Sequence, residues 1–180
     1  EQSAVDRFFE SGNEKFLQEM PFFKYNAESD GRNSREYFEL IKKMYTKKKK
    51  GKQKISLHCM DISEINPKKT VQDQREEKMA ENVLKQISDK TITFVITGNV
   101  HASKEKIKFG DISFKPMGCI LSEKLGKKLL SINIDPKKGK YFNITLKEII
   151  PEENETLKDN YDFTYLIEES SPCTFLKGGK

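Results

Sequence analysis

The chain lacks several features that would place it in a well-known class. It contains no apolar run of about 18 residues, so we expect no transmembrane helix. Glu1–Phe9 lacks the basic-then-apolar order of a signal peptide, and both a cytoplasmic protein and an exported one with its signal removed fit this pattern. The three cysteines include no CxxC spacing, so we expect neither a disulfide framework nor a zinc cluster.

The chain also has only a small excess of charge of one sign. The 33 Lys and Arg residues against 28 Asp and Glu give a net charge of +5, which is too small to require a nucleic-acid partner. The most basic segment is Lys47–Lys54, and nucleic-acid binding there is a low-weight alternative. No aromatic residue interleaves with its lysines, so we interpret it as a solvated helix end.

The length and the aromatic content predict a folded domain. Twelve Phe and six Tyr argue against disorder, and 180 residues suit one domain. We therefore expect a single domain over residues 1–180. Its expected parts are a helical cap at 1–50, a sheet with crossover helices at 54–168 and a flexible tail at 169–180.

The spacing of apolar residues predicts the order of the elements. Helices are expected after an N-cap at Asn33-Ser34, over Thr70–Lys90 and over Met117–Leu125. Short apolar segments predict strands at Ile55–Ile62, Thr91–Thr97, Leu129–Ile134, Tyr141–Leu146 and Tyr161–Ile167. Helices alternating with strands predict an α/β fold, with a mainly parallel central sheet flanked by helices and an N-terminal helical cap.

Polar residues follow two of the predicted strands. Asp61 lies at the end of one, and Asn99 and His101 follow the next. Because ligands bind outside the carboxyl ends of parallel strands, we expect these groups at one crevice. Arg75 precedes Met79 by one turn, so we expect it on the buried face of its helix, where it needs an acceptor or an anionic ligand.

Each of these residues also has a structural explanation. Arg75 as a clamp on Asp61 or Glu76, Asn99 as a turn residue and His101 as an exposed loop histidine are all consistent with the pattern. His58 is interpreted as a core histidine, and Cys59 and Cys119 are interpreted as buried thiols. The lysines beside His101 favour an acidic ligand at the mouth of the crevice, namely Lys104, Lys106 and Lys108.

Two segments carry a family resemblance. Arg75–Asn82, with its Arg-Glu-x-x-Met-Ala-x-Asn pattern, and Phe94–Ala102, with its Asn-x-His, resemble the second half of the erythromycin-esterase and ChaN-like (haem-uptake, Tiki) superfamily. Glu76 stands where that family usually has Asp. Pro116-Met117-Gly118 and Tyr161-Asp162-Phe163 resemble its closing segments, so the likeness extends over roughly Ala4–Glu168, about the C-terminal two-thirds of the family pattern.

The resemblance implies roles for the site residues. His101 would assist proton transfer or bind a metal, Asn99 would orient substrate or water, and Arg75 would hold an anionic group. Asp61, Glu76 and Lys104 are the other expected ligand-binding residues. A haem or divalent-metal cofactor is implied by the family alone, because His101 and Asp61 would supply at most two metal ligands, and we assign no metal site from the residues.

One departure from the family separates two functions. The family's opening Gly-Glu-x-His-Gly motif is absent from residues 1–180, so these residues alone lack the second base needed to activate water. With that motif elsewhere in the protein, we expect a hydrolase-like domain that binds a small anionic ligand. Without it, we expect a non-catalytic binding or interaction domain for haem or a protein partner.

Overall fold

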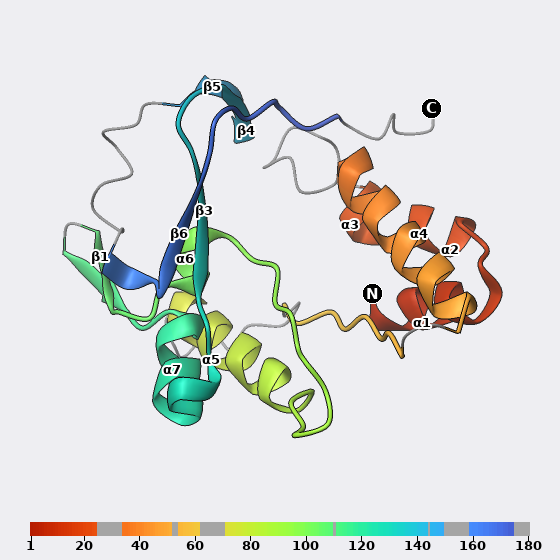
Figure 1. The fold of residues 1–180 in the computed structure, drawn as a ribbon, viewed down its shortest axis with the longest axis horizontal. Helices are drawn as coiled ribbons and strands as arrows, with labels where there is room; N and C mark the ends of the chain where they lie inside the picture. Colours follow the sequence, from red (N-terminus) through yellow and green to blue (C-terminus); the bar gives the residue numbers. More distant parts are fainter. Residues whose placement is uncertain are drawn as a thin grey trace. The chain divides into compact units, whose positions relative to one another are not determined.

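The computed structural model describes residues 1–24, 34–51, 54–61, 71–109, 111–143, 145–149 and 159–174. It divides into two compact units (Figure 1). The first unit comprises Glu1–Cys59, Lys138–Ile149 and Glu169–Lys180. The second comprises Met60–Lys137 and Ile150–Glu168. The two are described in turn.

The first unit begins with four helices, α1 (Gln2–Ser11), α2 (Lys15–Gln18), α3 (Pro21–Lys24) and α4 (Arg35–Lys49). Helix α1 ends because Gly12 adopts a left-handed φ of 74° and donates its N–H to the Phe8 carbonyl. Helix α4 begins where the Ser34 hydroxyl accepts the Tyr37 N–H at 3.2 Å, which confirms the predicted cap at Ser34. Its lysine-rich last turn leads to Gly51, also at positive φ.

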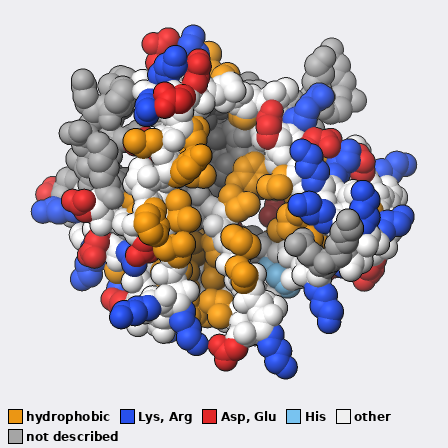
Figure 2. Space-filling model, in the orientation of Figure 1, with side chains coloured by type: hydrophobic (Ala, Val, Ile, Leu, Met, Phe, Trp, Pro, Cys, Tyr) orange, Lys and Arg blue, Asp and Glu red, His pale blue; other side chains and the backbone are white. Residues whose placement is uncertain are grey.

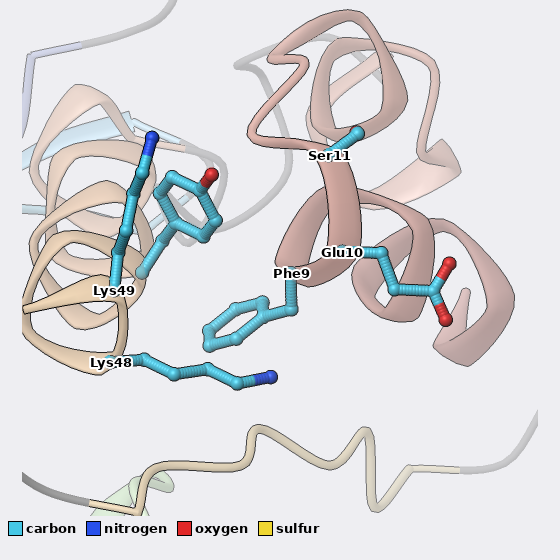
Figure 3. Close-up of a pocket in the computed structure, with 6 residues that line it drawn as sticks. Phe9, Glu10, Ser11, Lys48 and Lys49 are labelled. Carbon is cyan, nitrogen blue, oxygen red and sulfur yellow. The ribbon is translucent and has the colours of Figure 1, made fainter. Parts of the chain in front are cut away.

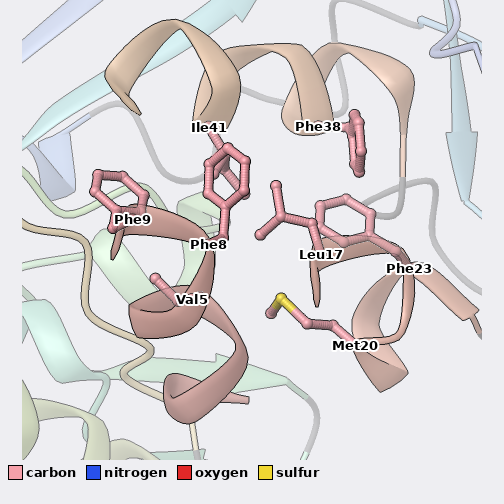
Figure 4. Packing of buried hydrophobic residues seen from close by; sticks show 8 residues of the cluster. All are labelled: Val5, Phe8, Phe9, Leu17, Met20, Phe23, Phe38 and Ile41. Atoms are coloured by element: carbon pink, nitrogen blue, oxygen red, sulfur yellow. The ribbon is translucent and has the colours of Figure 1, made fainter. Parts of the chain in front are cut away.

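These helices bury one apolar cluster (Figure 4). Phe8 and Leu17 are its least exposed members, and Phe23 meets Phe38 edge-on with ring centroids 5.3 Å apart. The cluster contains side chains from all four helices: Val5, Phe8, Phe9, Leu17, Met20, Phe23, Phe38 and Ile41. Because helices of four residues are unstable alone, burial in this cluster is what holds α2 and α3 in place.

The rest of the first unit is a hairpin and a C-terminal segment. Strands β4 (Lys140–Asn143) and β5 (Thr145–Glu148) pair antiparallel, where the sequence predicted one strand. The described part of the expected tail is hydrogen-bonded: Lys140 donates its N–H to the Ser170 carbonyl, and Arg35 donates its N–H to the Thr174 carbonyl at 2.7 Å.

The second unit mixes helices with small sheets. Its helices are α5 (Val71–Leu84), α6 (Asn99–Ala102), α7 (Met117–Leu125) and the 3-10 turn η1 (Gly126–Lys128). Its strands form an antiparallel hairpin, β1 (Ile107–Phe109) with β2 (Ile112–Phe114), and a parallel pair, β3 (Ile132–Pro136) with β6 (Phe163–Ile167). Helix α7 has the predicted bounds, whereas α5 ends six residues before the predicted Lys90.

Helices α5 and α7 form the core of this unit, with Met79, Ala80 and Val83 packed against Met117 and Leu121. Gly118 allows α7 to approach the turn after α6. A Cβ atom there would meet the Ala102 carbonyl and lie 2.6 Å from the carbonyl oxygen of Ser103. The N-terminal end of α7 is thereby held close to α6.

The coarse α/β class is confirmed, because helices flank a parallel pair of strands in which Ile132 lies beside Phe163 and Ile134 beside Tyr165. A large central parallel sheet is not shown in the described part of the chain. Among the described residues Thr91–Thr97 joins no strand ladder, and it is largely exposed, with Phe94 at 86%, so the predicted core strand there was wrong. β-branched residues favour extended backbone, but strand formation also needs a partner, which local sequence does not supply.

The structure also bears on three smaller expectations. Residues 55–61 of the predicted Ile55–Ile62 strand belong to no ladder, and Ile62 lies outside the described residues. His58 is exposed, so its interpretation as a core histidine was wrong, while Cys59 is half-buried and Cys119 is buried. None of the described helices combines the length and the apolar character needed to cross a membrane.

Candidate functional site

The buried face of α5 carries Glu76 rather than Arg75. Glu76 has no exposed surface, whereas 26% of the Arg75 side chain is exposed. Helical geometry explains the difference. Val83 lies seven residues after Glu76, about 20° away around the helix, but eight residues after Arg75, about 80° away. The expectation that Arg75 shares the buried stripe was therefore wrong.

The Glu76 carboxylate is held by donors from three helices. Its Oε1 atom accepts from Gln72 Nε2 at 2.5 Å, one turn earlier on α5, and lies 2.7 Å from Nδ1 of His101 on α6. Its Oε2 atom accepts the backbone N–H of Met117 at 2.8 Å, at the first residue of α7. Three donors, one from a helix N-terminus, offset the loss of water around a buried carboxylate.

This contact fixes the imidazole of His101. A carboxylate oxygen accepts hydrogen bonds, so the proton of the neutral ring lies on Nδ1, and Nε2 keeps a lone pair. The described residues give Nε2 no hydrogen bond, and 16% of the side chain is exposed. An imidazole oriented by a buried carboxylate in this way is equipped to take and return a proton.

Arg75 and Asp61 form a separate pair on the same unit. Arg75 Nε donates to Asp61 Oδ1 at 2.9 Å, and its terminal nitrogen lies 2.5 Å from Oδ2. This geometry confirms the structural alternative in which Arg75 clamps Asp61. The pair is half-exposed and joins α5 to the segment before it.

Asn99 begins α6, two residues before His101. Its side-chain oxygen accepts the N–H of Val100 at 2.8 Å, and its carbonyl accepts the Tyr161 hydroxyl at 2.9 Å. Burial raises the pKa of Tyr161 above its usual range, so the phenol stays protonated and keeps donating. The Tyr161 hydroxyl thus positions the backbone of Asn99, although the sequence analysis named Tyr161 only within a segment that resembles the family's closing segments.

Lys104 is tied down beside α6. Its ammonium lies 2.7 Å from Asp162 Oδ1, and Asp162 Oδ2 accepts the Ser131 N–H at 2.8 Å. Hydrogen bonds from Lys104 and from the Ser131 amide lower the pKa of Asp162. Lys106 and Lys108, the other two lysines of this series, are exposed.

The described residues contain no group of three or more His, Cys, Asp and Glu side chains that could hold a metal ion. Asp61 is engaged by Arg75, and His101, whose Nδ1 contacts Glu76, offers Nε2 alone, so this pair presents one ready ligand. The residues therefore do not fit the divalent metal that the family resemblance implied.

A shallow cavity lies in the first unit, near the lysine run (Figure 3). Its volume is about 390 Å³, and it lies between α1 and α4. Lys48 extends over the Phe9 ring, with its Nζ 5.2 Å from the ring centroid. The cavity is lined by Phe9, Glu10, Ser11, Tyr45, Lys48 and Lys49, of which the two lysines belong to the Lys47–Lys54 segment considered above for nucleic-acid binding.

Comparison of the chain with protein-family models, with curated proteins and with solved structures found no match. The likeness to the erythromycin-esterase and ChaN-like superfamily therefore remains a hypothesis.

Gln72 and the Met117 amide are the site groups that the sequence analysis missed. The Gln72-x-x-x-Glu76 spacing, one helical turn, is the signal that could have identified the first of them.

Replacing the buried carboxylate tests its structural weight. We expect Glu76→Ala to lower the free energy of unfolding by about 2–4 kcal/mol, because three donors lose their acceptor and a void remains. Urea denaturation followed by circular dichroism measures this. Glu81→Ala, on the exposed face of the same helix, is the control and should leave stability near that of the wild type. Equal effects of the two substitutions would contradict the role given to Glu76.

The Asp162 contacts predict a dependence on pH. Because the folded-state pKa of Asp162 is lowered, its contribution is present above the unfolded pKa of about 3.9 and is lost as pH falls through the lower folded value. Asp162→Asn should therefore be less stable than the wild type at pH 7, and the difference should vanish in acid. Urea unfolding at a series of pH values measures it. A difference that stays constant down to about pH 2 would contradict the assignment.

Proposed function

We propose that the second unit is a hydrolase-like domain that acts on a small anionic ligand through His101. The observation that carries this proposal is the contact between His101 Nδ1 and the fully buried Glu76 carboxylate, at 2.7 Å. A buried carboxylate that holds one nitrogen of a partly exposed imidazole orients the other nitrogen, which can then act as a general base. The resemblance to the erythromycin-esterase and ChaN-like superfamily supports the same function.

The chemistry follows from the tautomer. With its proton on Nδ1, His101 accepts a proton at Nε2 from water or from a substrate hydroxyl, and Glu76 stabilises the imidazolium that forms. Asn99 lies on the same turn of helix and offers an amide for orienting the substrate. Exposed Lys106 and Lys108 favour an anionic ligand, because Arg75 and Lys104 are already paired with carboxylates.

A second candidate is a non-catalytic binding or interaction domain. The described residues supply His101 as one imidazole base in this unit, and water activation in the resembling family uses a further Glu-His pair. Large apolar side chains are also exposed on this unit, which favours association with another molecule.

The discriminating experiment is turnover by the wild type and two histidine variants. The probes are p-nitrophenyl acetate and p-nitrophenyl phosphate, which report hydrolysis of a neutral and an anionic ester. We expect faster turnover of the anionic one, and we expect His101→Ala to lower kcat/KM about 100-fold or more. His58→Ala, which removes the exposed histidine of the first unit, is the matched control and should leave kcat/KM unchanged.

The structure also sets a stability requirement for this test. His101→Ala removes one donor from a buried carboxylate and should cost about 1–2 kcal/mol, so folding of the variant is checked by its urea transition. Full turnover by folded His101→Ala would contradict the catalytic role. A wild type inactive on both esters would contradict the hydrolase function and leave the binding domain.

A further inference from the structure

The second unit leaves an apolar edge segment in water. In Thr91–Thr97 the alternate residues Ile92, Phe94 and Ile96 are 83%, 86% and 60% exposed. The segment contains no charge, proline or glycine. The described residues give the backbone of residues 92–97 no backbone partner. It therefore has none of the devices by which proteins protect a free strand edge.

The parallel pair of β3 and β6 leaves an apolar face in water on the same unit. Two neighbouring pairs, Ile132 with Phe163 and Ile134 with Tyr165, share that face, and each of the four side chains is at least half exposed. Figure 2 shows hydrophobic side chains gathered over these strands. Parallel sheets in folded proteins are normally covered on both faces, so this one is incomplete alone.

The exposed area is that of a stable interface. The three residues of the edge segment and the four of the sheet face together expose on the order of 1,000 Å² per chain. Isolated soluble proteins rarely expose a patch of more than a few hundred Å², and a standard interface buries about 800 Å² per partner. The residues on this surface therefore match the needs of a protein interface.

We propose that a second copy of this chain covers this surface, with the two Thr91–Thr97 segments pairing antiparallel about a two-fold axis at Phe94. In that register Phe94 faces Phe94 of the other copy, and Ile92 faces Ile96. Each copy supplies the uncharged, β-branched partner that the other lacks, so the backbone groups that face the two-fold axis are paired in both copies at once. A helix docked on the same surface would cover the side chains but leave these backbone groups unpaired.

Sedimentation equilibrium of the full chain over a range of concentrations tests the proposal. We expect the wild type to move from the monomer mass of 20.9 kDa to twice that mass as concentration rises. Phe94→Lys and Phe94→Glu should each weaken dimerisation about 30-fold or more, because like charges then face each other. An equimolar mixture of the two variants should recover the dimer, because Lys faces Glu at the axis.

The controls separate this interface from general stickiness. Ile134→Lys, on the sheet face, should weaken the dimer, whereas Ile112→Lys, at a 67% exposed position on β2, should not. Circular dichroism checks that each variant folds. A wild type that is monomeric at every concentration, an open-ended assembly, or a dimer unaffected by Phe94→Lys would overturn the proposal. Failure of the mixed variants to pair would overturn it too.

Discussion

The buried carboxylate of Glu76 is the constraint on which the rest of the second unit depends. A charge without exposed surface is tolerated only if its oxygens are fully satisfied, and the donors come from α5, α6 and α7. Satisfying this one group fixes the start of α7 against α5 and sets the ring of His101. Packing of Met79, Ala80 and Val83 then continues the same helix face as an apolar core.

Two further pairs of charged groups in the described part of this unit are matched locally. Asp61 holds Arg75 with two contacts, and Asp162 bridges Lys104 and the Ser131 amide. In each pair a cation lies beside an anion. The imidazole of His101 differs, because its Nε2 atom has no hydrogen bond among the described residues. The proposed chemistry therefore centres on His101, with Asn99 beside it, rather than on the arginine that the sequence pattern first suggested.

Local signals in the sequence predicted what local forces decide. The Ser34 cap and the bounds of α7 follow from capping and periodicity. Two features did not follow. Arg75 and Glu76 both fit the spacing of a helical stripe, and only the angle to Val83 around the helix assigns the buried face to Glu76. Thr91–Thr97 has the composition of a strand but no strand partner among the described residues. Strand formation depends on a second segment to pair with, and the local residue pattern does not specify that segment.

The tautomer of His101 is the central claim, and nitrogen-15 NMR of the imidazole measures it directly. The account predicts a protonated Nδ1 hydrogen-bonded to Glu76 and an unprotonated Nε2 in the neutral ring, with this preference lost in Glu76→Gln. A neutral ring protonated on Nε2 in the wild type would contradict it, because the carboxylate would then face a bare nitrogen and could not orient a base.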